Sequence, residues 1–141
     1  MDFSSINWLA VVVCVVVSMI SGSIWYNPKT FFPVWWKVVG KENQAPGMQN
    51  MGMTWTLTVL SSLVQAVAMA LMVNAMGSLM TGGANLVNGA LTGWMLWLGF
   101  IAPTYLVNKL FAGHGLKIWA IEAGNHLVNF VLFGAILGAW R

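Results

Sequence analysis

The sequence contains very little charge. Only nine of its 141 residues are charged, six Lys or Arg and three Asp or Glu, which is 6% of the chain. Soluble domains carry about 25% charged residues, so this composition cannot form a water-soluble surface. The scarcity of charge excludes a cytoplasmic enzyme domain, a nucleic-acid-binding protein and a disordered linker. Cysteine is also scarce, and the single Cys14 cannot form an internal disulfide.

Long apolar stretches are abundant instead, and 59% of the residues are hydrophobic. A bilayer core about 30 Å thick requires about 20 mostly apolar residues per helix. Four stretches are long enough, at about 8–25, 54–76, 84–106 and 116–140. Helices are expected because lipid offers no partner to an unpaired backbone group. The sequence therefore predicts an all-α fold, a polytopic four-helix membrane bundle in which residues 1–141 form one domain.

The basic residues are distributed unevenly over the connections between these spans. Every lysine lies in or beside the first and third loops: Lys29, Lys37, Lys41, Lys109 and Lys117. The two termini carry only Asp2 and Arg141. Because cytoplasmic loops are enriched in Lys and Arg, we expect both lysine-bearing loops in the cytoplasm and both termini outside.

The segment 29–39, which follows the first span, is rich in aromatic residues and reads KTFFPVWWKVV. Aromatic side chains collect at the membrane–water boundary, so this segment is predicted to be a short helix or turn lying in the interface. The expected interface anchors are Trp25, Tyr26, Trp35 and Trp36. In a second interpretation these rings form a ligand cage, and Lys29 and Lys37 bind a lipid phosphate.

The end of the first span also carries a recognisable motif. It reads Gly22-Ser23-Ile24-Trp25-Tyr26-Asn27-Pro28, followed by Phe31 or Phe32, Trp35 or Trp36, and Gly40. This run resembles the signature of a bacterial family of small four-helix membrane proteins, domain of unknown function 1761. The resemblance implies the same fold over nearly the whole chain and a location in the bacterial inner membrane. It implies no reaction and no catalytic residue.

Polar residues at membrane depth form a stripe in the fourth span. Its members follow i, i+3, i+4, i+7 spacing and so share one helix face: Glu122, Asn125, His126 and Asn129. Glu122 and His126 are four residues apart and could pair directly. A central acidic residue costs roughly 2.5–3.5 kcal/mol on insertion scales, so such residues are expected to face the bundle interior and are candidates for function.

The other spans offer matching small or polar faces. In the second span this face consists of Thr54, Thr58, Ser61, Ser62 and Gln65. We expect these faces to converge on the Glu122 stripe. The opposite side of the fourth span carries Gly134 and Gly138, a small-xxx-small pattern that favours close helix contact. Useful contacts on both sides of one helix suggest self-association or a protein partner.

Three interpretations of the stripe stay open at this point. The polar groups could be interhelical hydrogen-bonding glue, each worth about 0.6–2 kcal/mol. They could form a proton or cation site, because Glu122 and His126 could exchange a proton near neutral pH. They could also supply two ligands of a metal site completed by symmetry, although two ligands fall short of tetrahedral zinc. No resident metal is expected on this count.

The favoured function is proton- or cation-linked transport or permeation of a small solute by a homo-oligomer. The alternative is a structural or accessory subunit of a larger membrane complex. An intramembrane enzyme acting on lipid is less favoured, because no nucleophile or oxyanion arrangement lies near Glu122 and His126. The expected partners are the lipid bilayer and either a second copy or another membrane protein, without a cofactor or nucleic acid.

Overall fold

The computed structural model describes residues 2–44, 47 and 50–141, and throughout these residues the fold contains helices and turns but no strand. The prediction of an all-α fold is confirmed. The elements are η1 (Phe3–Ser5), α1 (Trp8–Trp25), α2 (Phe32–Val38), α3 (Met51–Leu79), α4 (Leu86–Leu96), η2 (Trp97–Ile101), α5 (Ala102–Phe111) and α6 (Gly115–Ala139).

In the part of the chain that the structure describes, four helices are long and apolar enough to cross a membrane: Trp8–Trp25, Met51–Leu79, Leu86–Phe111 and Gly115–Ala139. The third combines α4, η2 and α5 into one continuous span. It extends five residues beyond the predicted end at 106, so the expected loop 107–115 is mostly helix and Lys109 lies within α5. The helix can continue through this lysine because its charge is paired with Glu122 of α6.

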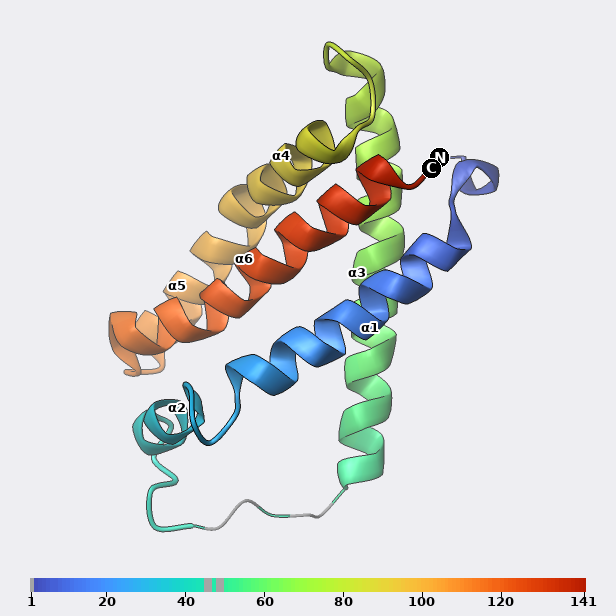
Figure 1. Ribbon diagram of the computed structural model, residues 1–141. Helices are drawn as coiled ribbons and strands as arrows, with labels where there is room; N and C mark the ends of the chain where they lie inside the picture. Colours follow the sequence, from blue (N-terminus) through green and yellow to red (C-terminus); the bar gives the residue numbers. More distant parts are fainter. Residues whose placement is uncertain (1, 45–46, 48–49) are drawn as a thin grey trace.

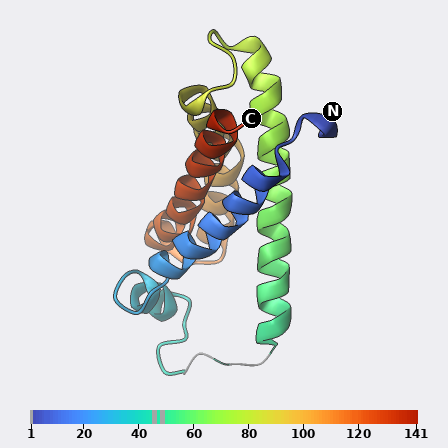
Figure 2. The same cartoon turned by 45° about the vertical axis from the view of Figure 1, so that its right-hand side comes forward.

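The helix α6 is central to the bundle (Figure 1). It packs against α4 and α5 on one side and against α1 and α3 on the other. The two termini lie close together at one end, while α2 and the α5–α6 turn lie at the opposite end. The helix α3 crosses the others steeply, and its first half stands apart from them in both views (Figure 2).

Glycines bring α4 and α6 into backbone contact. A Cβ on Gly89 would collide with the carbonyl of Gly134, and one on Gly138 would collide with the carbonyl of Asn85. The predicted small-xxx-small face of α6 is therefore real, but α4 of the same chain covers it. It no longer supports self-association, because this contact is already satisfied within the chain.

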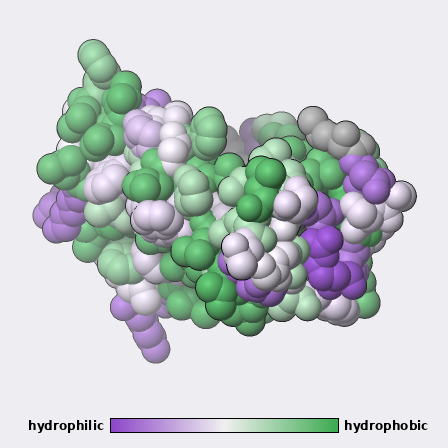
Figure 3. All heavy atoms as spheres, turned by 90° about the horizontal axis from the view of Figure 1, so that it is seen from above, coloured by the Kyte–Doolittle hydropathy of each residue, from purple (hydrophilic) through white to green (hydrophobic). Residues whose placement is uncertain are grey.

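The buried core is small and the apolar surface is large. Core residues from α1, α3 and α6 include Val11, Cys14, Val73 and Phe133, each at most 2% exposed. Large apolar side chains cover much of the outside, as the space-filling view shows for one face (Figure 3). An apolar outer surface is what a helical bundle in lipid requires, because the lipid tails surround it.

A change of helix type within the third span precedes the polar face of α5. The amide of Ala102 donates to the carbonyl of Trp97, five residues earlier, in the π-helical turn η2. Pro103 follows at once, and a proline removes one backbone donor and crowds the preceding turn. Such π turns locally reset the direction of side chains and occur at functional sites. Beyond this turn, Tyr105 and Lys109 face α6.

Candidate functional site

Two polar pairs connect α5 and α6 in antiparallel register. Lys109 Nζ lies 2.8 Å from Glu122 Oε2, and the hydroxyl of Tyr105 lies 2.8 Å from Nε2 of His126. Each helix contributes residues four apart, which share one face. The two helices are joined by the short turn around Gly113, whose φ of 76° favours glycine. This hairpin fixes the register of both pairs.

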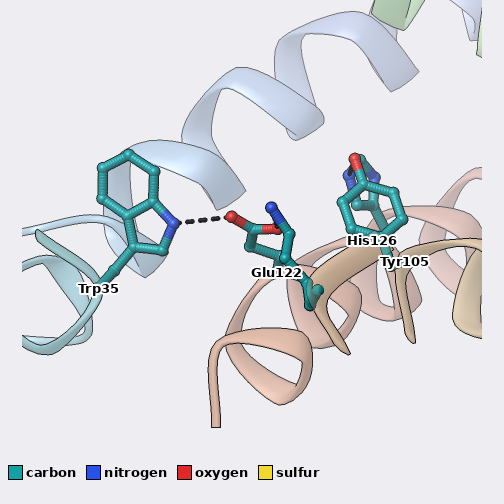
Figure 4. Close-up of polar contacts among 5 residues, drawn as sticks. Trp35, Tyr105, Glu122 and His126 are labelled. Carbon is teal, nitrogen blue, oxygen red and sulfur yellow. Dashed lines mark hydrogen bonds and ion pairs between the residues drawn. The ribbon is translucent and has the colours of Figure 1, made fainter. Parts of the chain in front are cut away.

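Glu122 is held by two partners. Its Oε1 accepts a hydrogen bond of 2.9 Å from the indole Nε1 of Trp35, and its Oε2 pairs with Lys109. The side chains of Lys109 and Glu122 are only 15% and 12% exposed. Figure 4 shows the indole of Trp35 pointing at the carboxylate from α2. At 1.5 Å per residue, Glu122 lies about 10 Å along α6 from its first residue.

His126 faces Tyr105 and not Glu122. The phenol and imidazole rings lie 5.0 Å apart between centroids, and Figure 4 shows them together, one helical turn from the carboxylate. The direct Glu122–His126 pair expected from their spacing is not formed, because each side chain has a partner from another helix. The Nδ1 atom of His126 is buried and has no hydrogen-bond partner in the described part of the chain.

The two asparagines of the stripe are buried deeper in the bundle. Asn125 donates a hydrogen bond of 3.2 Å to the hydroxyl of Ser21 on α1. Asn129 is 7% exposed, and its Oδ1 meets no donor from any described residue. Each asparagine lies three residues from Glu122 or His126, so the stripe runs as a polar line from the α2 end toward the middle of α6.

The polar face of α3 joins this line only in part. Ser62 is buried and hydrogen-bonded to Ser18 of α1 at 3.0 Å, whereas Thr54, Thr58 and Ser61 are exposed. Gln65 is half-buried, and the hydrogen bonds among described residues do not include its amide. No hydrogen bond among the described residues joins Gln65 to Glu122 or His126, and its place in the candidate site stays a prediction.

The aromatic residues at the end of α1 make specific internal contacts. The indole of Trp25 donates to the carbonyl of Ile121 at 2.8 Å. Tyr26 meets the ring of Trp35 edge-on, with centroids 5.7 Å apart. Burial, followed by the nearby charge of Glu122, raises the pKa of Tyr26 above its ordinary value. These contacts hold the rings within the bundle. The role of Trp25 and Tyr26 as interface anchors stays a prediction.

The remaining interfacial residues lie on the outer side of α2. The indole of Trp36 donates to the carbonyl of Gln44 at 2.9 Å. Lys37 pairs with Glu42 at 3.2 Å, and both side chains are well exposed. Lys29 is exposed as well. A role of Lys29 and Lys37 at lipid headgroups also stays a prediction.

The sequence alone does not place Lys109 or Tyr105 in the site, and it predicts Trp35 as an interface anchor or part of a ligand cage and not as a partner of Glu122. A signal for the first two was present. They are four residues apart, as are Glu122 and His126, and the glycines near 113 indicate a tight helical hairpin between the two pairs. In the described residues, no group of three or more His, Cys, Asp or Glu side chains gathers around a possible metal position.

Comparison with known proteins identifies one matching family. The family model described as "Protein of unknown function (DUF1761)" matches residues 9–138, nearly the whole chain. No curated protein and no solved structure matches the chain.

Proposed function

The chain belongs to the DUF1761 family, whose function is unknown, and we propose that it carries out proton- or cation-linked permeation of a small solute as a homo-oligomer. One observation carries this proposal. A carboxylate and an ammonium group, Glu122 and Lys109, are paired at 2.8 Å inside a helical membrane bundle. Ionisable groups at membrane depth are costly, and they mark ion pathways and proton relays.

The chemistry around the pair supports proton transfer. Glu122, Lys109, Tyr105 and His126 can each bind or release a proton, and the two pairs are one helical turn apart. The buried Nδ1 of His126 and Oδ1 of Asn129 extend the polar line with atoms that lack a protein partner. Buried polar atoms of this kind are satisfied by ordered water, and water would continue a relay toward the middle of the bundle.

Assembly of identical copies is supported by the exposed face of α3. Gln65 is the middle residue of this helix and is half-buried. Exposed residues continue its face at three- and four-residue steps: Thr58, Ser61, Ala68 and Met72. A primary amide both donates and accepts hydrogen bonds, so the side chain of Gln65 can pair with the same side chain of a second copy across a two-fold axis. We propose that this face packs on a second copy.

The proposed location is the bacterial inner membrane, with both termini outside. The five lysines lie in α2, in its flanking segments, and near the α5–α6 turn, at the end opposite the termini. The positive-inside rule supports a cytoplasmic position for that end. The Glu122 site would then lie about 10 Å from the start of α6 on the cytoplasmic side.

The experiment is proton movement in proteoliposomes that contain a trapped pH-sensitive dye, with potassium and valinomycin clamping the membrane potential. Wild-type protein should collapse an imposed pH gradient faster than empty liposomes do, and Glu122→Gln should return the rate to that of empty liposomes. Lys41→Gln is the matched control, because it removes an exposed charge at the same end. Equal rates for wild type and Glu122→Gln would exclude Glu122 from coupling.

A second candidate function is an accessory subunit of a larger membrane complex. The contacts of Glu122 favour it in one respect, since both carboxylate oxygens already have partners within the chain. A fully paired carboxylate can serve to hold α2, α5 and α6 together. Gentle extraction from native membranes separates the two proposals: a stoichiometric second protein supports the subunit, and a particle of identical chains supports permeation.

A further inference from the structure

A groove outside the polar site lies where α1, α2 and α6 meet. It has a volume of about 330 Å³ and is lined by Trp25, Phe31, Val34, Lys117, Ala120 and Ile121. This volume falls in the range of about 300–1,000 Å³ that is typical of ligand pockets. The lining is almost wholly apolar, and Lys117 is the one charged residue among those that form it.

The polar atoms around the groove are already engaged, apart from Lys117. The indole nitrogen of Trp25 donates to the carbonyl of Ile121, so this ring presents only its apolar surface. Lys117 is exposed and forms no ion pair with a described residue. By contrast, Lys37 and Lys109 are each paired with a glutamate. The groove therefore fits an apolar chain with one anionic group at its rim.

The groove also lies at the depth where such a molecule is found. Lys117 is in the first turn of α6, and α2 is the aromatic helix expected at the membrane–water boundary. A phospholipid presents its acyl chains just inside this boundary and its phosphate at it. Basic side chains at this level attract anionic lipid, at about 1 kcal/mol for each Lys.

We propose that the groove binds an acyl chain of an anionic phospholipid, whose phosphate pairs with Lys117. The occupant is an anionic lipid because, among the described residues that line the groove, the one charged side chain is a cation without an ion-pair partner, and because the other lining side chains are apolar. This site is separate from the permeation function proposed above, and neither depends on the other.

The bound lipid completes the packing of α2. This helix has seven residues, none of which is buried. It reaches the bundle through the Trp35–Glu122 hydrogen bond and through the contact of Trp35 with Tyr26, at 5.7 Å between ring centroids. Phe31, which immediately precedes the helix, adds a contact with Trp25 at 4.8 Å between centroids. An acyl chain between Val34 and Ala120 adds apolar contact to the same side. The lipid thus holds α2 in place over Glu122.

The test is native mass spectrometry of the full chain with added phosphatidylglycerol or phosphatidylethanolamine. Wild type should retain one phosphatidylglycerol in preference to phosphatidylethanolamine. Lys117→Gln should lower phosphatidylglycerol affinity about fivefold, the equivalent of about 1 kcal/mol, whereas Ala120→Phe should lower the affinity for both lipids by filling the groove. Lys41→Gln is the control, because this exposed lysine lies over the ring of Trp36, outside the groove.

Three results would overturn the proposal. Equal losses in Lys117→Gln and Lys41→Gln would mean general attraction to a basic surface. Unchanged lipid retention in Ala120→Phe would place the lipid elsewhere. A change in oligomer mass in Ala120→Phe, without a change in bound lipid, would assign the groove to a protein contact.

Hydrogen–deuterium exchange gives an independent readout. Phosphatidylglycerol should slow exchange of the α2 amides in wild type but not in Lys117→Gln, because the lipid anchors this helix through the groove. Equal protection in both proteins would overturn the role assigned to Lys117.

Discussion

The Lys109–Glu122 pair makes a quantitative prediction about stability. Replacing one partner of a buried ion pair leaves the other charge uncompensated, which costs about 3–5 kcal/mol. Because the two side chains are 15% and 12% exposed, we expect the lower end of this range, about 3 kcal/mol, for Glu122→Gln and for Lys109→Gln alone. In Glu122→Gln the side-chain oxygen can still accept the hydrogen bond from Trp35. The loss of stability in this variant therefore reflects mainly the unpaired charge of Lys109.

The double variant Glu122→Gln/Lys109→Gln should behave differently. It leaves two neutral amides that can hydrogen-bond to each other, so that no uncompensated charge stays buried in the bundle. We expect its free energy of unfolding to lie within about 1 kcal/mol of wild type, so that the two substitutions are strongly non-additive.

The assay is reversible unfolding of all four proteins in mixed micelles, followed by far-ultraviolet circular dichroism at increasing mole fractions of dodecyl sulfate. The coupling free energy follows from the double-mutant cycle. A loss in the double variant equal to the sum of the single losses would refute the reasoning, since it would mean that the two charges do not stabilise each other.

Three further predictions concern the helix contacts around the site. Gly89→Ala should lower the free energy of unfolding in dodecyl sulfate by about 1–3 kcal/mol, because the added Cβ would meet the backbone of α6. Gly22→Ala is the control and should raise it by about 0.5–1 kcal/mol, because open space surrounds that position. Equal effects of the two substitutions would contradict the close contact of α4 with α6. Trp35→Phe keeps a ring but removes the donor to the carboxylate, and should cost about 1.5–3 kcal/mol in the same assay. Burial raises the pKa of Tyr26. In a Tyr105→Phe variant, which leaves Tyr26 as the one tyrosine, the phenolate absorbance should therefore appear at higher pH in the folded than in the unfolded protein. The stability that this group contributes is present below about pH 10, the ordinary pKa of tyrosine, and is lost as the pH rises above it.

Several features of the fold could be predicted from the sequence because they depend on local chemistry. The apolar runs are long enough for four helices, and the spacing of Glu122, Asn125 and His126 places them on one helix face. Membrane depth leaves little choice of secondary structure, which is why the apolar runs alone predict the fold class.

The partners of the site residues could not be predicted in the same way. The sequence predicts Lys109 in the loop that follows the third apolar span, but in the structure it lies within α5 and Glu122 of α6 compensates its charge. Similarly, the glycines at 134 and 138 indicate a close helix contact without specifying the partner helix. They meet α4 of the same chain, a pairing that depends on topology and not on either helix alone.

The most direct test of the central proposal is proton flux through the double variant Glu122→Gln/Lys109→Gln in proteoliposomes. Its free energy of unfolding is expected to lie within about 1 kcal/mol of wild type, so a loss of flux would not be due to unfolding. If the pair is part of a proton or cation pathway, the imposed pH gradient should decay as slowly as in empty liposomes. Decay at the wild-type rate would contradict the account and leave the pair a purely structural connection between α5 and α6.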